Sequence, residues 1–256
     1  MFTPKVKFSL IPIKLEVNLI YFFLFYEKWG WGKKIIKRHP YLKGALNIKT
    51  KKNREKYIKK YIIKFRNENK KIIENQIEKY SKNWRKIEKQ YLTILPEILD
   101  TPWPKDKKII KAMISINPIC PRFINNWSFS LFYKQKAKKM KETIMHEICH
   151  FLYFKKWKEV FPNSPKKTFE YPYIEWHLSE ILAPIILNDL RIQKLLKRKA
   201  VFYKEHQKIK IDGAAAPKHF LLLYKENVDK NYRFEEFLRK AYSEIKKHRK
   251  KFQKIS

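Results

Sequence analysis

The pentapeptide His146-Glu147-Ile148-Cys149-His150 lies inside a run of helix-forming residues from about Lys136 to Trp157. Side chains four residues apart lie on the same face of an α-helix, so both imidazoles can reach one metal ion while Glu147 projects beside them. Apolar residues around the two histidines predict that the helix passes here from the surface into the core. The pattern therefore predicts a metal site on a partly buried helix.

The chemistry of a zinc hydrolase explains each position of this motif. A catalytic zinc ion takes three protein ligands and keeps its fourth position open for water. His146 and His150 would supply two of these ligands. Glu147 would accept a proton from the attacking water as general base and pass it to the leaving amine. A third ligand must therefore come from elsewhere in the chain.

The residues before the motif predict strands. Ala112–Ile116 is apolar, and Trp127–Tyr133 alternates between apolar and polar residues, as a half-buried strand does. With the motif, this order resembles the zincin metallopeptidases over roughly Ala112 to Asp189. The resemblance implies an α+β, predominantly helical fold in which a small sheet packs on the helix that carries the two histidines. It also implies zinc (Zn²⁺) and hydrolysis of peptide or protein substrates.

The resemblance is greatest to the thermolysin-like branch, called gluzincins, in which a glutamate on a downstream helix completes the zinc site. Glu180 resembles that ligand best: it follows His150 by 30 residues and begins an apolar stretch of a predicted helix from Glu175 to about Asp189. His177 lies on the same face and is an alternative ligand or a neighbour that orients one. Glu175 and Asp189 are further alternatives. The aspartate that often follows the ligand glutamate by four residues is replaced by Pro184.

Other branches of zincin-like proteases fit less well. A branch with a further histidine close behind the motif needs one between Phe151 and Phe161, where there is none. The proteases that clear protein crosslinks from DNA have a similar motif, but their third histidine comes much sooner than His177. Several residues could donate to a transition-state oxyanion, and the sequence does not choose among them: His206, His219, Tyr171, Tyr173, Tyr203 and Tyr224.

The rest of the chain reads as strands followed by helices. Val6–Ile11 and Leu15–Phe25 predict one or two core strands, and Lys33 to about Leu99 predicts two or three amphipathic helices. Basic helices are expected over 189–203 and 234–251, with a turn at Gly213–Pro217 between them. The expected organisation is an N-terminal subdomain, 1–157, with the sheet, helices and motif helix. A helical C-terminal subdomain, 158–256, would carry the third ligand.

The two cysteines, Cys120 and Cys149, cannot form the disulfide framework of a small secreted domain. A reducing, cytoplasmic setting is therefore expected. The longest uninterrupted apolar run, Leu19–Tyr26, is far shorter than the roughly 20 residues that span a bilayer. No transmembrane segment is therefore expected.

The net charge of +36 suggests a second function. Such a charge attracts phosphate backbones, so a basic nucleic-acid-binding protein, or an inactive scaffold with a structural histidine motif, is the alternative to a peptidase. The basic residues are mostly lysine, whereas base and phosphate recognition tends to favour arginine. We therefore expect most of this charge to be a solvated surface, with a zinc metallopeptidase as the main prediction.

Overall fold

A computed structural model of the chain describes residues 2–26, 30–230 and 233–254. The contacts within it divide the chain into two compact units. The sheet unit comprises Lys5–Lys86 and Ile109–Ile144, and the site unit comprises Met1–Pro4, Ile87–Lys108 and Met145–Ser256. This grouping differs from the expected division at 157/158, because segments distant in the chain pack into the same unit. Each unit is described by itself.

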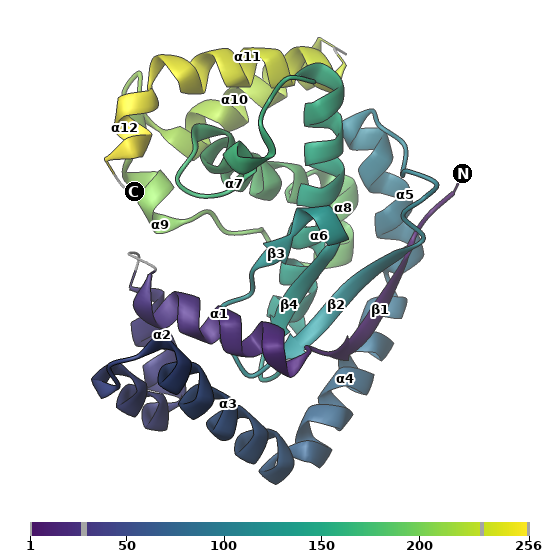
Figure 1. Cartoon of the computed structure of the whole chain (residues 1–256). Helices are drawn as coiled ribbons and strands as arrows, with labels where there is room; N and C mark the ends of the chain where they lie inside the picture. The colour runs from purple at the N-terminus through teal and green to yellow at the C-terminus, as the bar shows by residue number, and fades with distance from the viewer. Residues whose placement is uncertain (1, 27–29, 231–232, 255–256) are drawn as a thin grey trace. The chain divides into compact units, whose positions relative to one another are not determined.

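The sheet unit is built on a mixed four-stranded sheet in the order β1-β2-β4-β3 (Figure 1). Its strands are β1 (Lys5–Leu10), β2 (Ile109–Ser115), β3 (Arg122–Phe123) and β4 (Ser128–Phe132). β2 pairs in parallel with β1 and β4, while β3 pairs with β4 in the antiparallel sense. All residues of β4 are buried, as expected for an inner strand of a parallel sheet. The three predicted strands 6–11, 112–116 and 127–133 are confirmed.

The predicted strand at Leu15–Phe25 is wrong, because this segment is helix α1 (Ile13–Phe25). A short apolar run does not distinguish a strand from a buried helix by its pattern. Glu16 is fully buried and accepts hydrogen bonds from Arg66 Nη2 at 2.6 Å and from the Ser115 hydroxyl at 2.5 Å. A buried carboxylate is stable only with such partners, which only the folded chain brings together.

The predicted helical region 33–99 is confirmed, with more helices than expected. Its elements are α2 (Trp31–Arg38), the 3₁₀ helix η1 (Pro40–Asn47), α3 (Lys51–Glu68), α4 (Lys70–Arg85) and α5 (Glu88–Leu99). The Thr50 hydroxyl caps α3 by accepting a hydrogen bond from the backbone N–H of Asn53. α2, α3 and α4 belong to the sheet unit, and α5 belongs to the site unit.

The site unit is helical apart from a two-stranded hairpin. α6 (Ala137–Val160) enters it from the sheet unit and is followed by η3 (Lys166–Phe169) and α7 (Ile174–Leu187). The remaining elements are α8 (Leu190–Leu196), α9 (Lys204–Lys208), β5 (Lys210–Ile211), β6 (Ala214–Ala215), α10 (Ala216–Asp229), α11 (Phe234–Lys247) and α12 (Arg249–Gln253). Within the described residues, every helix is too short or too polar to cross a membrane.

α7 lies at the centre of the site unit. Every one of its 14 residues is buried, and it contacts η3, α8, α10, α11 and α12. A helix that is apolar on all sides requires neighbours on all sides, and the surrounding helices supply them (Figure 1). α7 is therefore a rigid platform for the few polar side chains that it carries.

Two predictions for the C-terminal region need correction. Only Leu190–Leu196 is helical in the segment 189–203, because Lys197 adopts a left-handed conformation that ends α8. Helix α10 was not predicted. The turn expected at Gly213–Pro217 is confirmed in part: Asp212 and Gly213 form the two-residue turn of the β5–β6 hairpin, both with positive φ.

Candidate metal centre

Three of the predicted ligands meet at one point in the site unit. α6 presents His146 and His150 one turn apart, and α7 presents Glu180 opposite them. His146 Nε2 lies 3.1 Å from Glu180 Oε2, and His150 Nε2 lies 3.4 Å from Glu180 Oε1. The two Nε2 atoms are 3.0 Å apart. The predicted ligand set His146, His150 and Glu180 is thus brought together from two helices, although Glu180 follows His150 by 30 residues.

These distances fit a single metal ion. Ligand atoms at about 2.0–2.2 Å from a tetrahedral zinc ion lie roughly 3.3–3.6 Å from one another. The separations of 3.0, 3.1 and 3.4 Å lie within a few tenths of an ångström of that range, and the last two run to different oxygens of the Glu180 carboxylate. Two imidazoles and one carboxylate are also a donor set that zinc prefers. The residues present therefore fit a zinc ion in both spacing and chemistry.

The burial of the three side chains suits such a site. Glu180 and His150 are almost completely buried, whereas the His146 side chain keeps 18% of its surface exposed. A buried carboxylate is costly unless an opposite charge or a metal compensates it. The exposed edge of His146 gives the centre access to solvent, which a hydrolytic site requires.

Glu147 follows His146 on α6 and is 7% exposed. Successive residues of an α-helix are rotated by about 100° around its axis. Glu147 therefore lies to one side of the helix face that carries His146 and His150. Its position agrees with a carboxylate beside the centre that is not itself a third ligand. The group of potential ligands that the described residues form here contains only His146, His150 and Glu180.

Neighbouring side chains hold α6 in place. The ring of His150 stacks on Phe154 at 6.1 Å between centroids, and Phe154 stacks in turn on Phe169 of η3 at 4.3 Å. The hydroxyl of Tyr91 on α5 donates a hydrogen bond of 2.5 Å to the backbone carbonyl of Met145. These contacts fix the turn of α6 that carries the two histidines, so the imidazoles are oriented before any ion binds.

His177, the alternative ligand, is not part of this group. Its Nδ1 lies 2.9 Å from Nε2 of His206 on α9, and both rings are buried. Burial, followed by the charge of His206, lowers the pKa of His177 to about 3. Burial likewise lowers the pKa of His206 to about 4. Both rings are therefore neutral at pH 7, and one must donate a hydrogen to the other.

The two further alternatives have other partners. Glu175, in the first turn of α7, accepts a hydrogen bond of 2.8 Å from the hydroxyl of Tyr242. Asp189 caps α8 by accepting a hydrogen bond from the backbone N–H of Arg191, and its carboxylate also binds the guanidinium of that residue. Neither carboxylate belongs to the group formed by the two motif histidines.

The sequence did not indicate the pairing of His177 with His206 or the aromatic support of His150. His206 was only one of six candidate donors, and no local pattern connects it with a histidine 29 residues away. Cys149 is fully buried next to His150. Burial, followed by the carboxylates of Glu147 and Glu180, raises the pKa of its thiol well above the usual range. It is therefore a packing residue rather than a thiolate ligand.

Comparison of the chain with protein-family models, with characterised proteins and with solved structures finds no match.

Proposed function

We propose that this protein is a zinc-dependent metallopeptidase with a gluzincin-like centre, in which His146, His150 and Glu180 hold the ion and Glu147 is the general base. The observation that supports this most directly is that the two histidine Nε2 atoms of α6 and the two carboxylate oxygens of Glu180 on α7 converge, with separations of 3.0–3.4 Å. A peptide or protein is the substrate class, because this donor set with a neighbouring carboxylate suits hydrolysis of an amide bond.

Each residue has a separate task in this proposal. When bound, a zinc ion lowers the pKa of the attacking water toward neutrality and polarises the scissile carbonyl. Glu147 accepts the proton from that water and later donates it to the leaving amine. Glu180 supplies a negative charge that compensates part of the charge of the ion in a buried setting. Phe154 keeps the ring of His150 in a fixed orientation.

The zincin-like fold and the cytoplasmic setting belong to the same proposal. The sheet and the metal helix lie in different units apart from the first turns of α6, so the packing of the sheet on that helix stays a prediction. Within the described part of the chain, neither Cys120 nor Cys149 is in a disulfide. Reduced cysteines persist in a reducing compartment, which supports a cytoplasmic location.

Metal content measured by plasma mass spectrometry tests the proposed ligands. The protein is purified without a histidine tag as wild type and as Glu180→Gln, Glu175→Gln and His177→Ala. Glu175→Gln is the matched control, because it removes a buried carboxylate from the same helix without touching the ligand group. We expect zinc to be lost from this centre in Glu180→Gln and retained in the other two variants.

Retention of the same zinc content in Glu180→Gln would show that Glu180 is not a ligand. Loss of zinc in His177→Ala but not in Glu180→Gln would transfer the role of third ligand to His177. Circular dichroism on each variant separates the loss of a ligand from the loss of the fold.

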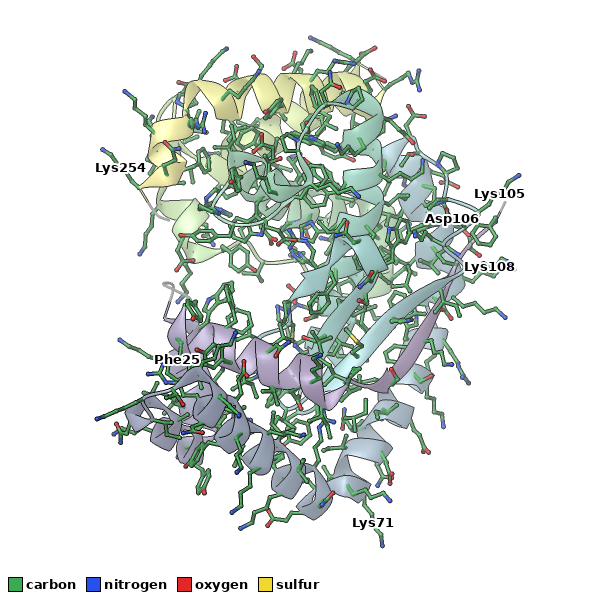
Figure 2. The ribbon with its side chains drawn as sticks, viewed as in Figure 1. Phe25, Lys71, Lys105, Asp106, Lys108 and Lys254 are labelled. Carbon is green, nitrogen blue, oxygen red and sulfur yellow. The ribbon has the colours of Figure 1, made fainter. Side chains whose placement is uncertain are left out.

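A second candidate function, nucleic-acid binding, is favoured by the distribution of charge. The sheet unit contains 31 basic and 7 acidic residues, a net charge of +24, whereas the site unit has 29 and 17, a net charge of +12. Lysines of α3 and α4 are exposed, and Lys71 on α4 extends away from the ribbon (Figure 2). A cavity of about 750 Å³ next to α4 is lined in part by Lys79, Lys82 and Arg85.

Binding to a short DNA or RNA duplex at several salt concentrations tests this second function. Contacts to phosphates release counterions, so the logarithm of the affinity should fall linearly with the logarithm of the salt concentration, with a slope of about −0.9 per phosphate. Replacing Lys79, Lys82 and Arg85 with Gln should reduce the slope, while Lys246→Gln on α11 serves as a control outside the sheet unit. An affinity that hardly changes with salt would contradict the idea.

A further inference from the structure

A second cluster of potential ligands lies in the site unit, on elements other than those of the candidate centre. Asp212 in the hairpin turn, Glu244 on α11 and His248 at the end of α11 offer ligand atoms that all lie within 4.8 Å of one another. His219 on α10 faces the same cluster: its Nδ1 is 3.9 Å from Asp212 Oδ2, and its Nε2 is 3.7 Å from Glu244 Oε2.

The local structure explains why these residues meet. Asp212 and Gly213 form a tight turn with φ of 48° and 78°, and Asp is one of the few residues other than Gly that tolerate this conformation. Glu244 and His248 are four residues apart, so they lie on one face of α11 and its end.

The distances from His219 to the two carboxylates are longer than hydrogen bonds. A separation of 3.7 Å is too long for a hydrogen bond between His219 and Glu244. His219 Nε2 is buried and has no hydrogen-bond partner among the described residues. Donor atoms bound at about 2.0–2.2 Å to a tetrahedral zinc ion lie roughly 3.3–3.6 Å apart. The ligand atoms of Asp212, Glu244 and His248 all lie within 4.8 Å of one another, so small side-chain movements would bring them around one ion.

Charge also points to a cation. The chain has only 24 acidic residues against 60 basic ones, yet two carboxylates and two of its seven histidines gather here. Lys247 Nζ already contacts Glu244, but only through Oε1, at 2.6 Å. The other oxygen, Oε2, faces His219. The donor set of imidazole and carboxylate suits a divalent ion such as zinc.

We propose that Asp212, Glu244 and His248 form a second divalent-metal site with a structural role. The site joins the β5–β6 hairpin to the junction between α11 and α12, and His219 of α10 lies beside two of its ligands. It is independent of the proposed peptidase function, because it shares no residue with the centre at His146, His150 and Glu180.

The position of this site gives it a structural consequence. His248 directly precedes α12, and Lys251 of α12 donates a hydrogen bond of 2.9 Å to the carbonyl of Lys210 on β5. Phe252 of α12 is fully buried, with its ring 5.6 Å from that of His177 on α7. An ion bound at the junction would hold α12 against the helix that carries Glu180.

The test uses the Glu180→Gln background, in which the centre at His146 and His150 is expected to lose its zinc ion. Zinc is added to full-length Glu180→Gln, the protein is dialysed against metal-free buffer, and its zinc content is measured by plasma mass spectrometry. The same is done for Glu180→Gln combined with Glu244→Gln, and for Glu180→Gln combined with Glu236→Gln. The last is the matched control, because Glu236 is an exposed carboxylate two turns earlier on the same helix.

We expect about two zinc ions per chain in the wild type, about one in Glu180→Gln and in the control, and essentially none with Glu244→Gln. Zinc should also raise the thermal midpoint of Glu180→Gln by at least about 2 °C, and should not do so when Glu244 is replaced. If Glu244→Gln impairs folding, His248→Ala replaces it, and circular dichroism checks each variant.

Two results would overturn the proposal. In the first, the Glu180→Gln protein retains no zinc after dialysis. In the second, the Glu180→Gln protein still retains zinc when Glu244→Gln is added and also when His248→Ala is added. The first would mean adventitious binding only, and the second a different site. The wild type could instead bind one zinc ion that is retained in Glu180→Gln and lost when Glu244→Gln is added. That result would support this site and contradict the proposed peptidase centre.

Discussion

The buried pair of His177 and His206 should make the protein less stable in mildly acidic solution. Burial lowers the pKa of His177 to about 3 and that of His206 to about 4, and the charge of His206 further opposes protonation of His177. Their nitrogens are only 2.9 Å apart, so two positive charges cannot share this position. In the unfolded chain both rings have an ordinary pKa of about 6.5.

The sign and size of the effect follow from these values. Between pH 6.5 and about 4 the unfolded chain binds more protons than the folded one, so stability falls as the pH falls through this window and is fully present above it. At pH 5, which is 1.5 units below the pKa in the unfolded chain, each histidine lowers the free energy of unfolding by about 2 kcal/mol. For the two histidines together the loss is at most about 4 kcal/mol, because the hydrogen bond between the rings couples their protonation.

Urea unfolding at pH 7.5 and pH 5.0, in the presence of a chelator, measures this loss. The wild type is compared with a His177→Asn, His206→Asn double variant, which keeps polar groups but removes both titrating rings. His219→Asn is the control that leaves the buried pair intact. The wild type and the control should lose about 2–4 kcal/mol more than the double variant between the two pH values. Equal losses in all three proteins would refute the assignment to this pair.

Three further predictions concern the candidate centre. Glu147→Gln should keep zinc and the fold but reduce peptide cleavage by about 10²–10⁴-fold, because the general base is lost; unchanged cleavage, assayed against a peptide library, would exclude this role. Phe154→Ala should destabilise the protein by roughly 3–5 kcal/mol, because it leaves a cavity beside His150; a chemical denaturation curve that shifts by less than 1 kcal/mol would contradict it. Iodoacetamide should modify Cys120 in the folded protein and spare the buried Cys149, whose pKa is raised by burial; mass mapping of the labelled peptides would detect the opposite order.

The sequence determined the features that depend on one helix or one strand. The helical period places His146 and His150 on one face, whatever the rest of the fold does. The apolar β2 and α7 were also evident as apolar runs, and β4 was evident from the alternation of its apolar and polar residues. Glu180 was singled out by its resemblance to the gluzincin ligand, together with the cost of burying a carboxylate without a partner.

Features that depend on contacts between distant segments were decided only by the tertiary structure. The carboxylate of Glu16 on α1 is buried because Arg66 and Ser115 donate hydrogen bonds to it, and no local pattern predicts these partners. The same holds for His177 with His206 and for the cluster at Asp212, Glu244 and His248. Periodicity specifies neighbours within one element, whereas the partner of a buried polar group is specified by how whole elements pack.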